Sequence, residues 1–270
     1  GTSFKPYIGF HKDSWTEDPK ITTISGGTYS GKLPDDRIYN RNKGKLFYSI
    51  SDAVSDAASQ NVIEIWPGHF KENVHVNQRI TLIGSGTSRT IVNGRYLESP
   101  FTFDTSSDNS IIKNLAVINS KNTTNCCSVS TMSAGIELTN SDNTVIDNVR
   151  ADSYIGILAY YSNGVVIKNS EIISTSSTHQ YGIRLYYYKD YTIKNNEISN
   201  YVYGLRIEYV FEGLEIEDNY IHNNTNYGAW LSSVGNTNAR TNPIEFVGNR
   251  FVDNNYGIYK GDSSSSYGYS

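Results

Sequence analysis

A short phrase repeats along the second half of the chain. Each copy has an apolar residue, a polar one and then Asn or a substitute, and later a Gly followed by an aliphatic residue; the copies read VIDNV…YIGIL, VIKNS…YGIRL, TIKNN…YGLRI, EIEDN…YGAWL and EFVGN…YGIYK. Apart from insertions at 174–180 and 232–242, the period is about 21–22 residues, which is typical of a solenoid whose coils bury their apolar faces against each other. The 3.6-residue periodicity of helical repeats is missing.

The chain before the repeat indicates a capped start. Residues 49–59 (SISDAVSDAAS) place apolar side chains at helical spacing, with Ser49 as the N-cap, and predict a short helix across the open end of the solenoid. Three short alternating strands follow, with Pro67-Gly68 after the first and the run from Gly84 to Gly86 after the third. Residues 1–45 lie outside the repeat and are rich in turn residues, so an extended N-terminal arm is expected there.

This opening resembles a known superfamily. The helix, VIEIWPGHFKENVHV, ITLIGSG and TIVNG are together similar to the start of right-handed parallel β-helix proteins of the pectin-lyase-like superfamily, in the branch of pectin methylesterases and NosD-type repeat proteins. The resemblance covers residues 47–260 and implies an all-β fold, a single-stranded right-handed parallel β-helix of about 8 coils. The expected organisation is an arm at 1–45, the β-helix at 46–260 and a Ser/Gly/Tyr tail at 261–270. The fold hosts enzymes, adhesins and structural fibres, so it does not by itself assign a function.

Two columns of side chains follow from the repeat. One holds the residue two positions after the first apolar residue (Ile or Phe) of each copy and favours a structural role, because Asn and Asp tolerate left-handed backbone at a bend. It consists of Asn114, Asn148, Asn169, Asn195, Asp218 and Gly248. The other lies in the strand that follows the Gly of each copy, where alternate side chains point outward. Its candidate ligand-binding residues are Glu137, Tyr160, Arg184, Tyr186, Arg206, Glu208, Trp230 and Tyr259.

The outward column admits three interpretations. Arg can pair with the carboxylates of an acidic polysaccharide while Tyr and Trp stack on sugar rings. Arg206 can instead pair with Glu208 in a solvated ladder with packed aromatics, or the face can be a protein interface. A net charge of −4 argues against nucleic acid as a partner, and no apolar run is long enough to span a membrane.

Catalytic residues cannot be assigned from the sequence. The paired Asp motifs of pectin methylesterases and the signatures of polygalacturonases, pectate lyases and alginate epimerases are absent. The histidines form no HxH or HxxxH pair, so neither a metal nor another cofactor is predicted, and His69 and His75 are expected at the surface. A lyase that uses Arg184 or Arg206 with a Tyr base stays open as an alternative.

Several features suggest a secreted protein. Asn122 and Asn223 head glycosylation sequons, and the adjacent Cys126 and Cys127 are compatible with free thiols, a vicinal disulfide or a bridge to another chain. The start GTSFKPY lacks the pattern of a signal peptide, so we expect an extracellular or cell-surface protein in its mature form.

The first hypothesis for function is a non-catalytic structural protein that assembles with copies of itself. The last coil runs into the low-complexity tail without a cap, which leaves a strand edge open. Contact through the two ends and terminal segments would be head-to-tail and would build a filament. A polysaccharide-binding module is the second hypothesis, and a polysaccharide lyase or epimerase acting on uronates is the third.

Overall fold

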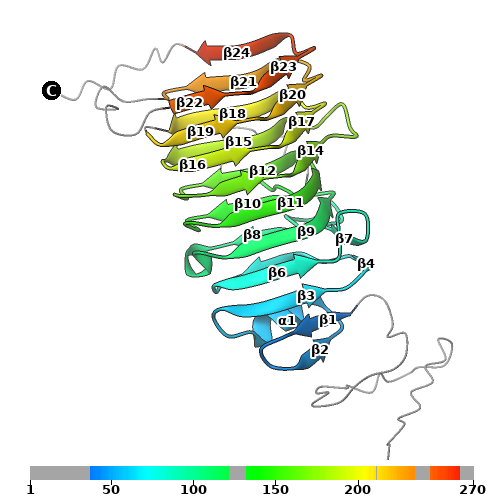
Figure 1. Cartoon of the computed structure of the whole chain (residues 1–270). Coiled ribbons are helices and arrows are strands. Elements are labelled where there is room, and N and C mark those ends of the chain that lie inside the picture. Colours follow the sequence, from blue (N-terminus) through cyan, green and yellow to red (C-terminus); the bar gives the residue numbers. More distant parts are fainter. Residues whose placement is uncertain (1–36, 122–131, 211, 235–243, 262–270) are drawn as a thin grey trace, which may run out of the picture.

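The chain folds into an elongated stack of coils (Figure 1). The computed structural model describes residues 37–121, 132–210, 212–234 and 244–261. Within these residues the stack has 8 coils, one for each strand of an 8-stranded parallel sheet. The predicted parallel β-helix and its number of coils are therefore confirmed. No helix in the described part is long and apolar enough to cross a membrane.

Three rows of parallel strands run along the stack. The first sheet contains β3 (Asn61–Ile65), β6 (Ile80–Gly84), β9 (Ile111–Ile118), β11 (Val145–Asp152), β13 (Val166–Lys168), β16 (Tyr191–Lys194), β19 (Leu214–Glu217) and β22 (Ile244–Val247). The second sheet is joined to the first through the long strands β9 and β11 and adds β4 (Gly68–Phe70), β7 (Thr90–Asn93), β14 (Glu171–Ile173), β17 (Glu197–Ser199), β20 (Tyr220–His222) and β23 (Arg250–Val252).

The third sheet closes each coil and positions the candidate site. It contains β5 (Val74–Val76), β8 (Phe101–Phe103), β10 (Ile136–Thr139), β12 (Ile155–Tyr160), β15 (Tyr181–Tyr188), β18 (Tyr203–Val210), β21 (Tyr227–Ser232) and β24 (Tyr256–Gly261). A 3₁₀ turn, Thr105–Ser107, follows β8.

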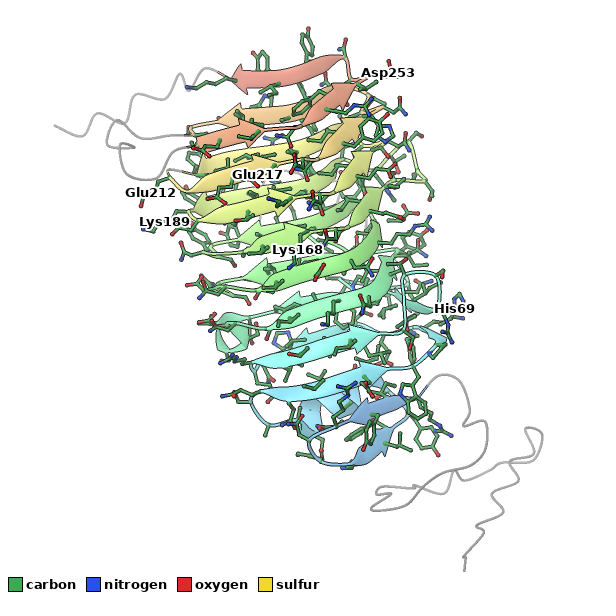
Figure 2. All side chains as sticks on the ribbon, in the orientation of Figure 1. His69, Lys168, Lys189, Glu212, Glu217 and Asp253 are labelled. Carbon is green, nitrogen blue, oxygen red and sulfur yellow. The ribbon has the colours of Figure 1, made fainter. Side chains whose placement is uncertain are left out.

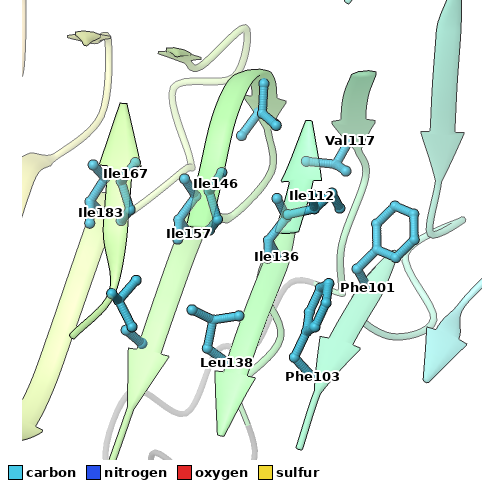
Figure 3. Packing of buried hydrophobic residues seen from close by; sticks show 14 of the residues in the cluster. Phe101, Phe103, Ile112, Val117, Ile136, Leu138, Ile146, Ile157, Ile167 and Ile183 are labelled. Atoms are coloured by element: carbon cyan, nitrogen blue, oxygen red, sulfur yellow. The ribbon is translucent and has the colours of Figure 1, made fainter. Parts of the chain in front are cut away.

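The core is a set of aliphatic ladders between the sheets (Figure 3). Ile146 pairs in register with Ile112 below it and Ile167 above it, and Ile136 pairs with Ile157 in the third sheet. All of them are buried, because alternate residues of each strand point inward. Burying one such side chain contributes about 1.5–3 kcal/mol, so the ladders supply the main driving force for stacking.

The N-terminal end is covered by a helix and a hairpin. Helix α1 (Ile50–Asp56) begins after Ser49, whose hydroxyl accepts a hydrogen bond from the Asp52 amide, as predicted. The helix ends before residue 59 because Ala57 is already extended. β1 (Ile38–Asn40) and β2 (Lys45–Phe47) form an antiparallel hairpin whose β1 pairs with β3. Residues 38–45, assigned from sequence to the extended arm, are thus part of the cap.

The bends between the first and second sheets use left-handed backbone. Asn114, Asn148, Asn169, Asn195 and Asp218 have φ between 51° and 59°, and Gly248 has φ 66°. Side-chain amides also link neighbouring coils, as where Asn148 Nδ2 donates to Asn114 Oδ1 at 2.9 Å. This column therefore has the structural role that the sequence indicated.

A second amide ladder lies one residue further on, and two of its members, Asn196 and Asn219, are buried. Asn196 Nδ2 donates to Asn219 Oδ1 at 3.0 Å, and Asn219 Nδ2 donates to Asn249 Oδ1 at 2.9 Å. Each amide also hydrogen-bonds backbone groups of adjacent coils. The sequence reasoning missed this ladder, whose sign is an Asn one residue after the first column in the last three copies.

The insertion at 174–180 is held by an acid and a histidine. Asp152 accepts hydrogen bonds from the amide and the hydroxyl of Thr175, and its Oδ1 lies 3.4 Å from Nδ1 of the buried His179. Burial alone would raise the pKa of Asp152, but the hydrogen bonds from His179 and Thr175 outweigh burial and lower it.

A pH dependence follows from this lowered pKa. A carboxyl with a depressed folded-state pKa stabilises the fold above its unfolded pKa of about 3.9 and loses that contribution as the pH falls through the folded value. We therefore expect Asp152→Asn to flatten the acid side of the stability curve measured by urea unfolding. Glu171→Gln, at an exposed carboxyl of the next coil, serves as the control. An unchanged acid limb in Asp152→Asn would contradict the assignment.

Candidate functional site

The outer face of the third sheet carries the predicted outward column. The register aligns His75, Thr102, Glu137, Leu158, Arg184, Arg206, Trp230 and Tyr259 in one row. A second row, two residues along each strand, contains Thr139, Tyr160, Tyr186, Glu208, Ser232 and Gly261. The sequence thus predicted correctly which of these side chains are neighbours.

The first sheet has a different outer face. It carries charged side chains, among them Lys168 and Glu217 (Figure 2). Lys194 pairs with Glu217, and at the neighbouring bend Lys189 lies 2.9 Å from Glu212. These pairs are substantially exposed, as expected of a solvated face.

The middle of the third-sheet face is buried, contrary to expectation. Arg184 is only 3% exposed and donates from Nε to Glu208 Oε2 at 2.9 Å. Its Nη1 group contacts Met132 Sδ at 2.8 Å, and its guanidinium lies over the rings of Tyr181 and Tyr186. Arg184 and Glu208 therefore do not form the open surface that strand alternation alone suggested.

Glu208 is shared between two guanidinium groups. Arg206 donates to it from Nε at 2.9 Å and from Nη2 at 3.1 Å, and its Nη1 donates to the Tyr181 hydroxyl at 3.3 Å. Burial would lower the pKa of Arg206, but the hydrogen bonds and charge of Glu208 raise it. The paired-ladder interpretation of Arg206 and Glu208 is correct in its contact, although the pair is more buried than a solvated ladder.

The N-terminal part of the face is acidic. Glu137 accepts a hydrogen bond from the Ser99 hydroxyl at 2.6 Å, and burial raises the pKa of its carboxyl despite the hydrogen bonds from Ser99 and Thr139. His75 is exposed, as predicted, and pairs with Asp104 at 2.9 Å.

Aromatic side chains cover the C-terminal part of the face. We call Tyr203, Arg206, Tyr227, Trp230, Tyr256 and Tyr259 the aromatic patch. The guanidinium of Arg206 lies 4.5 Å from the centre of the Trp230 ring. Tyr203, Tyr227 and Tyr256 stack in succession at 5.3 and 5.1 Å between ring centres. Tyr256 and Tyr259 are 50% and 40% exposed, so the patch is open at its end.

A second group of tyrosines lies at the carboxyl ends of β12, β15 and β18 in the same sheet. The tyrosine block consists of Tyr160, Tyr161, Tyr186, Tyr187 and Tyr209. Tyr161, Tyr187 and Tyr209 stack at 4.8 and 4.7 Å with nearly parallel rings, and Tyr160 and Tyr186 meet this stack edge-on. Burial and the neighbouring phenol and carboxylate groups raise the pKa of Tyr186 to about 12. The sequence reasoning named Tyr160 and Tyr186 and missed the stack, whose signal is a Tyr following each of them or closing the strand.

The other candidate residues lie apart from this face. Asn223 is exposed at a bend after β20, where its Nδ2 lies 3.0 Å from His222 Nδ1. Asn122, Cys126 and Cys127 fall outside the described residues. No group of three or more His, Cys, Asp or Glu side chains in the described part could hold a metal ion.

Solved structures similar to this chain include carbohydrate-active enzymes. The catalytic domain of a GH87 α-1,3-glucanase D1068A in complex with tetrasaccharides matches with a TM-score of 0.53 and 14% identity. The same catalytic domain in complex with nigerose matches with a TM-score of 0.52 and 15% identity. Each match covers 78% of this chain and 43% of the other, so the chain spans less than half of those domains. Pectin methylesterase from Yersinia enterocolitica matches at a TM-score of 0.41 and 13% identity, over 78% of this chain and 90% of that one.

The family assignment comes from a sequence model. A search among curated proteins found no match. The family model described as right handed beta helix region matches residues 102–244, more than half of the chain. This match and the stacked parallel sheets confirm the fold expected from the resemblance to the pectin-lyase-like superfamily. The chain belongs to the right-handed β-helix family.

Proposed function

We propose that the protein binds an uncharged polysaccharide on the aromatic patch. The observation that carries the proposal is a continuous run of half-exposed and exposed aromatic rings over β18, β21 and β24, with a guanidinium fixed among them. Aromatic rings with a polar edge suit the apolar faces and hydroxyl groups of sugars. The patch is a site for contact, and no reaction is part of the proposal.

The state of the two arginines favours an uncharged ligand. Arg184 is buried, and Arg206 already holds Glu208 through two hydrogen bonds. A uronate carboxylate would have to displace Glu208, and this would leave Arg184 without its buried counter-charge. The acidic-polysaccharide groove and the Arg-dependent lyase considered from sequence are therefore less consistent with the geometry than a neutral glycan is.

The comparisons support a carbohydrate ligand in a general way. Two of the similar solved structures, at TM-scores of 0.52 and 0.53, are complexes of a glucanase with nigerose and with tetrasaccharides. Their identity to this chain is too low to transfer a substrate or catalytic residues. The carboxylate that touches the patch, Glu208, is held by two guanidinium groups, which is unsuitable for a general acid or base.

Trp230→Ala tests the proposal. The variant should lose retention on immobilised neutral glucans by affinity electrophoresis, because Trp230 is the largest ring of the patch. Trp66→Ala, at a half-buried Trp of the first coil, should bind like the wild type. Preferential binding of the wild type to uronans that disappears with added salt would overturn the neutral-ligand proposal. A lack of retention on every polysaccharide would overturn binding altogether.

Self-assembly stays a second proposal, supported by one feature. Ile258 has the inward register of Ala229 but is 49% exposed, and the last described coil also exposes Val247 and Tyr256. The N-terminal end is covered by α1 and the β1–β2 hairpin, so contact between two C-terminal ends fits better than the head-to-tail filament first expected. Light scattering tests this proposal: the mass of the wild type should rise with protein concentration, and that of Ile258→Asp should stay at the monomer value. A wild type that is monomeric at all concentrations would overturn it. The extracellular location and the use of Asn223 as a glycosylation site stay predictions.

A further inference from the structure

The bend that follows the third sheet repeats one backbone conformation in five successive coils. Its residues all have positive φ, from 51° to 67°: Asn140, Tyr161, Tyr187, Tyr209 and Ser233. Left-handed backbone is a minor cost for Asn but an uncommon and strained state for a bulky side chain. Three consecutive coils nevertheless place Tyr there, while the coils on either side use the small polar residues that the conformation favours.

The same chain provides its own reference for such a bend. At the bend between the first and second sheets, five coils solve the identical backbone problem with Asn or Asp. There the amides link neighbouring coils without an aromatic residue, as between Asn148 and Asn114. The backbone of the bend therefore does not account for Tyr161, Tyr187 and Tyr209, and their side chains must.

Packing accounts for only part of the tyrosine block. Stacking within the block offsets some of the backbone cost. The three rings are half-buried, however, and do not belong to the aliphatic core. Residues held in strained backbone cluster at sites of contact with a ligand.

We infer that the tyrosine block is a second carbohydrate-contact site, which extends the aromatic patch toward the N-terminal coils. The inference rests on the proposed function. The two surfaces meet on β18, which carries Arg206 of the patch and Tyr209 of the block. The patch covers β18 to β24, and the block covers β12 to β18. Together they span about 20 Å along the stack at ~4.8 Å for each coil, so only an extended chain covers both surfaces from end to end.

The length of the oligosaccharide distinguishes binding at the aromatic patch alone from binding at both sites. The probes are linear α-1,3- and β-1,4-linked gluco-oligosaccharides, from disaccharides to octasaccharides, with binding measured by calorimetry. For the wild type, affinity should rise with length. The triple variant Tyr161→Asn, Tyr187→Asn and Tyr209→Asn should lose about tenfold in affinity for the longest probe and keep its affinity for disaccharides. Trp230→Ala should weaken the binding of the longest probe and of the disaccharides alike.

Matched variants keep the test decisive. Tyr96→Asn makes the same substitution at another positive-φ tyrosine, φ 59°, outside both surfaces, and should bind like the wild type. If the triple variant does not fold, the single Tyr209→Asn variant replaces it, since it removes only the end of the stack. Equal affinity of wild type and folded variant for the longest probe would overturn the second site and leave the patch standing. Absence of binding to every probe would overturn both.

Discussion

Glu208→Gln should lower the free energy of unfolding by about 3–5 kcal/mol, measured by urea denaturation, because it leaves a buried charge without its partner. Arg184 is 3% exposed and its guanidinium is held by the Glu208 carboxylate at 2.8 Å. Gln has nearly the same shape, but its single carbonyl oxygen cannot serve both Arg184 and Arg206, and its amide group turns N–H donors toward a cation. The loss is therefore electrostatic rather than steric.

An exposed ion pair provides the control for this prediction. Lys194 and Glu217 also pair between neighbouring coils, but their side chains are 43% and 27% exposed. Glu217→Gln should cost at most about 1 kcal/mol, since water can replace the lost partner. Equal effects of the two substitutions would mean that Arg184 reaches solvent when Glu208 is neutralised, and would contradict its burial beneath Met132.

The spacing of the repeat was sufficient to predict the fold and the register. Each coil is built from local strand and bend signals, and stacking places equivalent positions of successive coils side by side. For this reason the alignment of Arg184 with Arg206, and of Tyr186 with Glu208, followed directly from the sequence. The structural role of Asn148 and its equivalents followed in the same way, from the backbone preference of Asn.

Exposure could not be predicted in this way, because it depends on segments that leave the repeat. Strand alternation gives the direction of Arg184 but not the presence of Met132, which lies outside the strands, before β10, and contacts its guanidinium. Leu158, also in the outward row, is buried in a small cluster with Met132 and Ala134. Side chains from irregular segments thus decide which part of an outward column a ligand can reach.

The tyrosine block could not be predicted from the sequence, because it depends on the backbone conformation of the bends. Tyr161 and Tyr187 stand next to Tyr160 and Tyr186, but an adjacent pair of tyrosines at a strand end has no fixed geometry. The positive φ of each second tyrosine brings the rings into one stack. Backbone conformation at a bend is set by the whole coil, so a residue that contradicts its own preference reveals itself only in three dimensions.

Gly182→Ala should destabilise the protein by about 3 kcal/mol or more, at the upper end of the usual cost of overpacking. A Cβ at this position would lie 2.6 Å from the carbonyl oxygen of Gly204 and 2.7 Å from Cγ2 of Ile198. Neither is the flexible end of a side chain, and both belong to the next coil, so these two coils would have to move apart. The substitution thereby strains the parallel pairing of β15 with β18 as well as the core.

The equivalent Gly of the last described coil separates this steric cause from a conformational one. Among the described residues, a Cβ on Gly257 would meet only Cβ of Phe251, at 3.8 Å, an ordinary contact. Gly257→Ala should thus change the urea midpoint little, whereas Gly182→Ala lowers it strongly. If both substitutions cost the same, the glycines would be required for their backbone conformation. If only Gly182→Ala is costly, the column of glycines exists because each coil must approach the next more closely than a side chain permits.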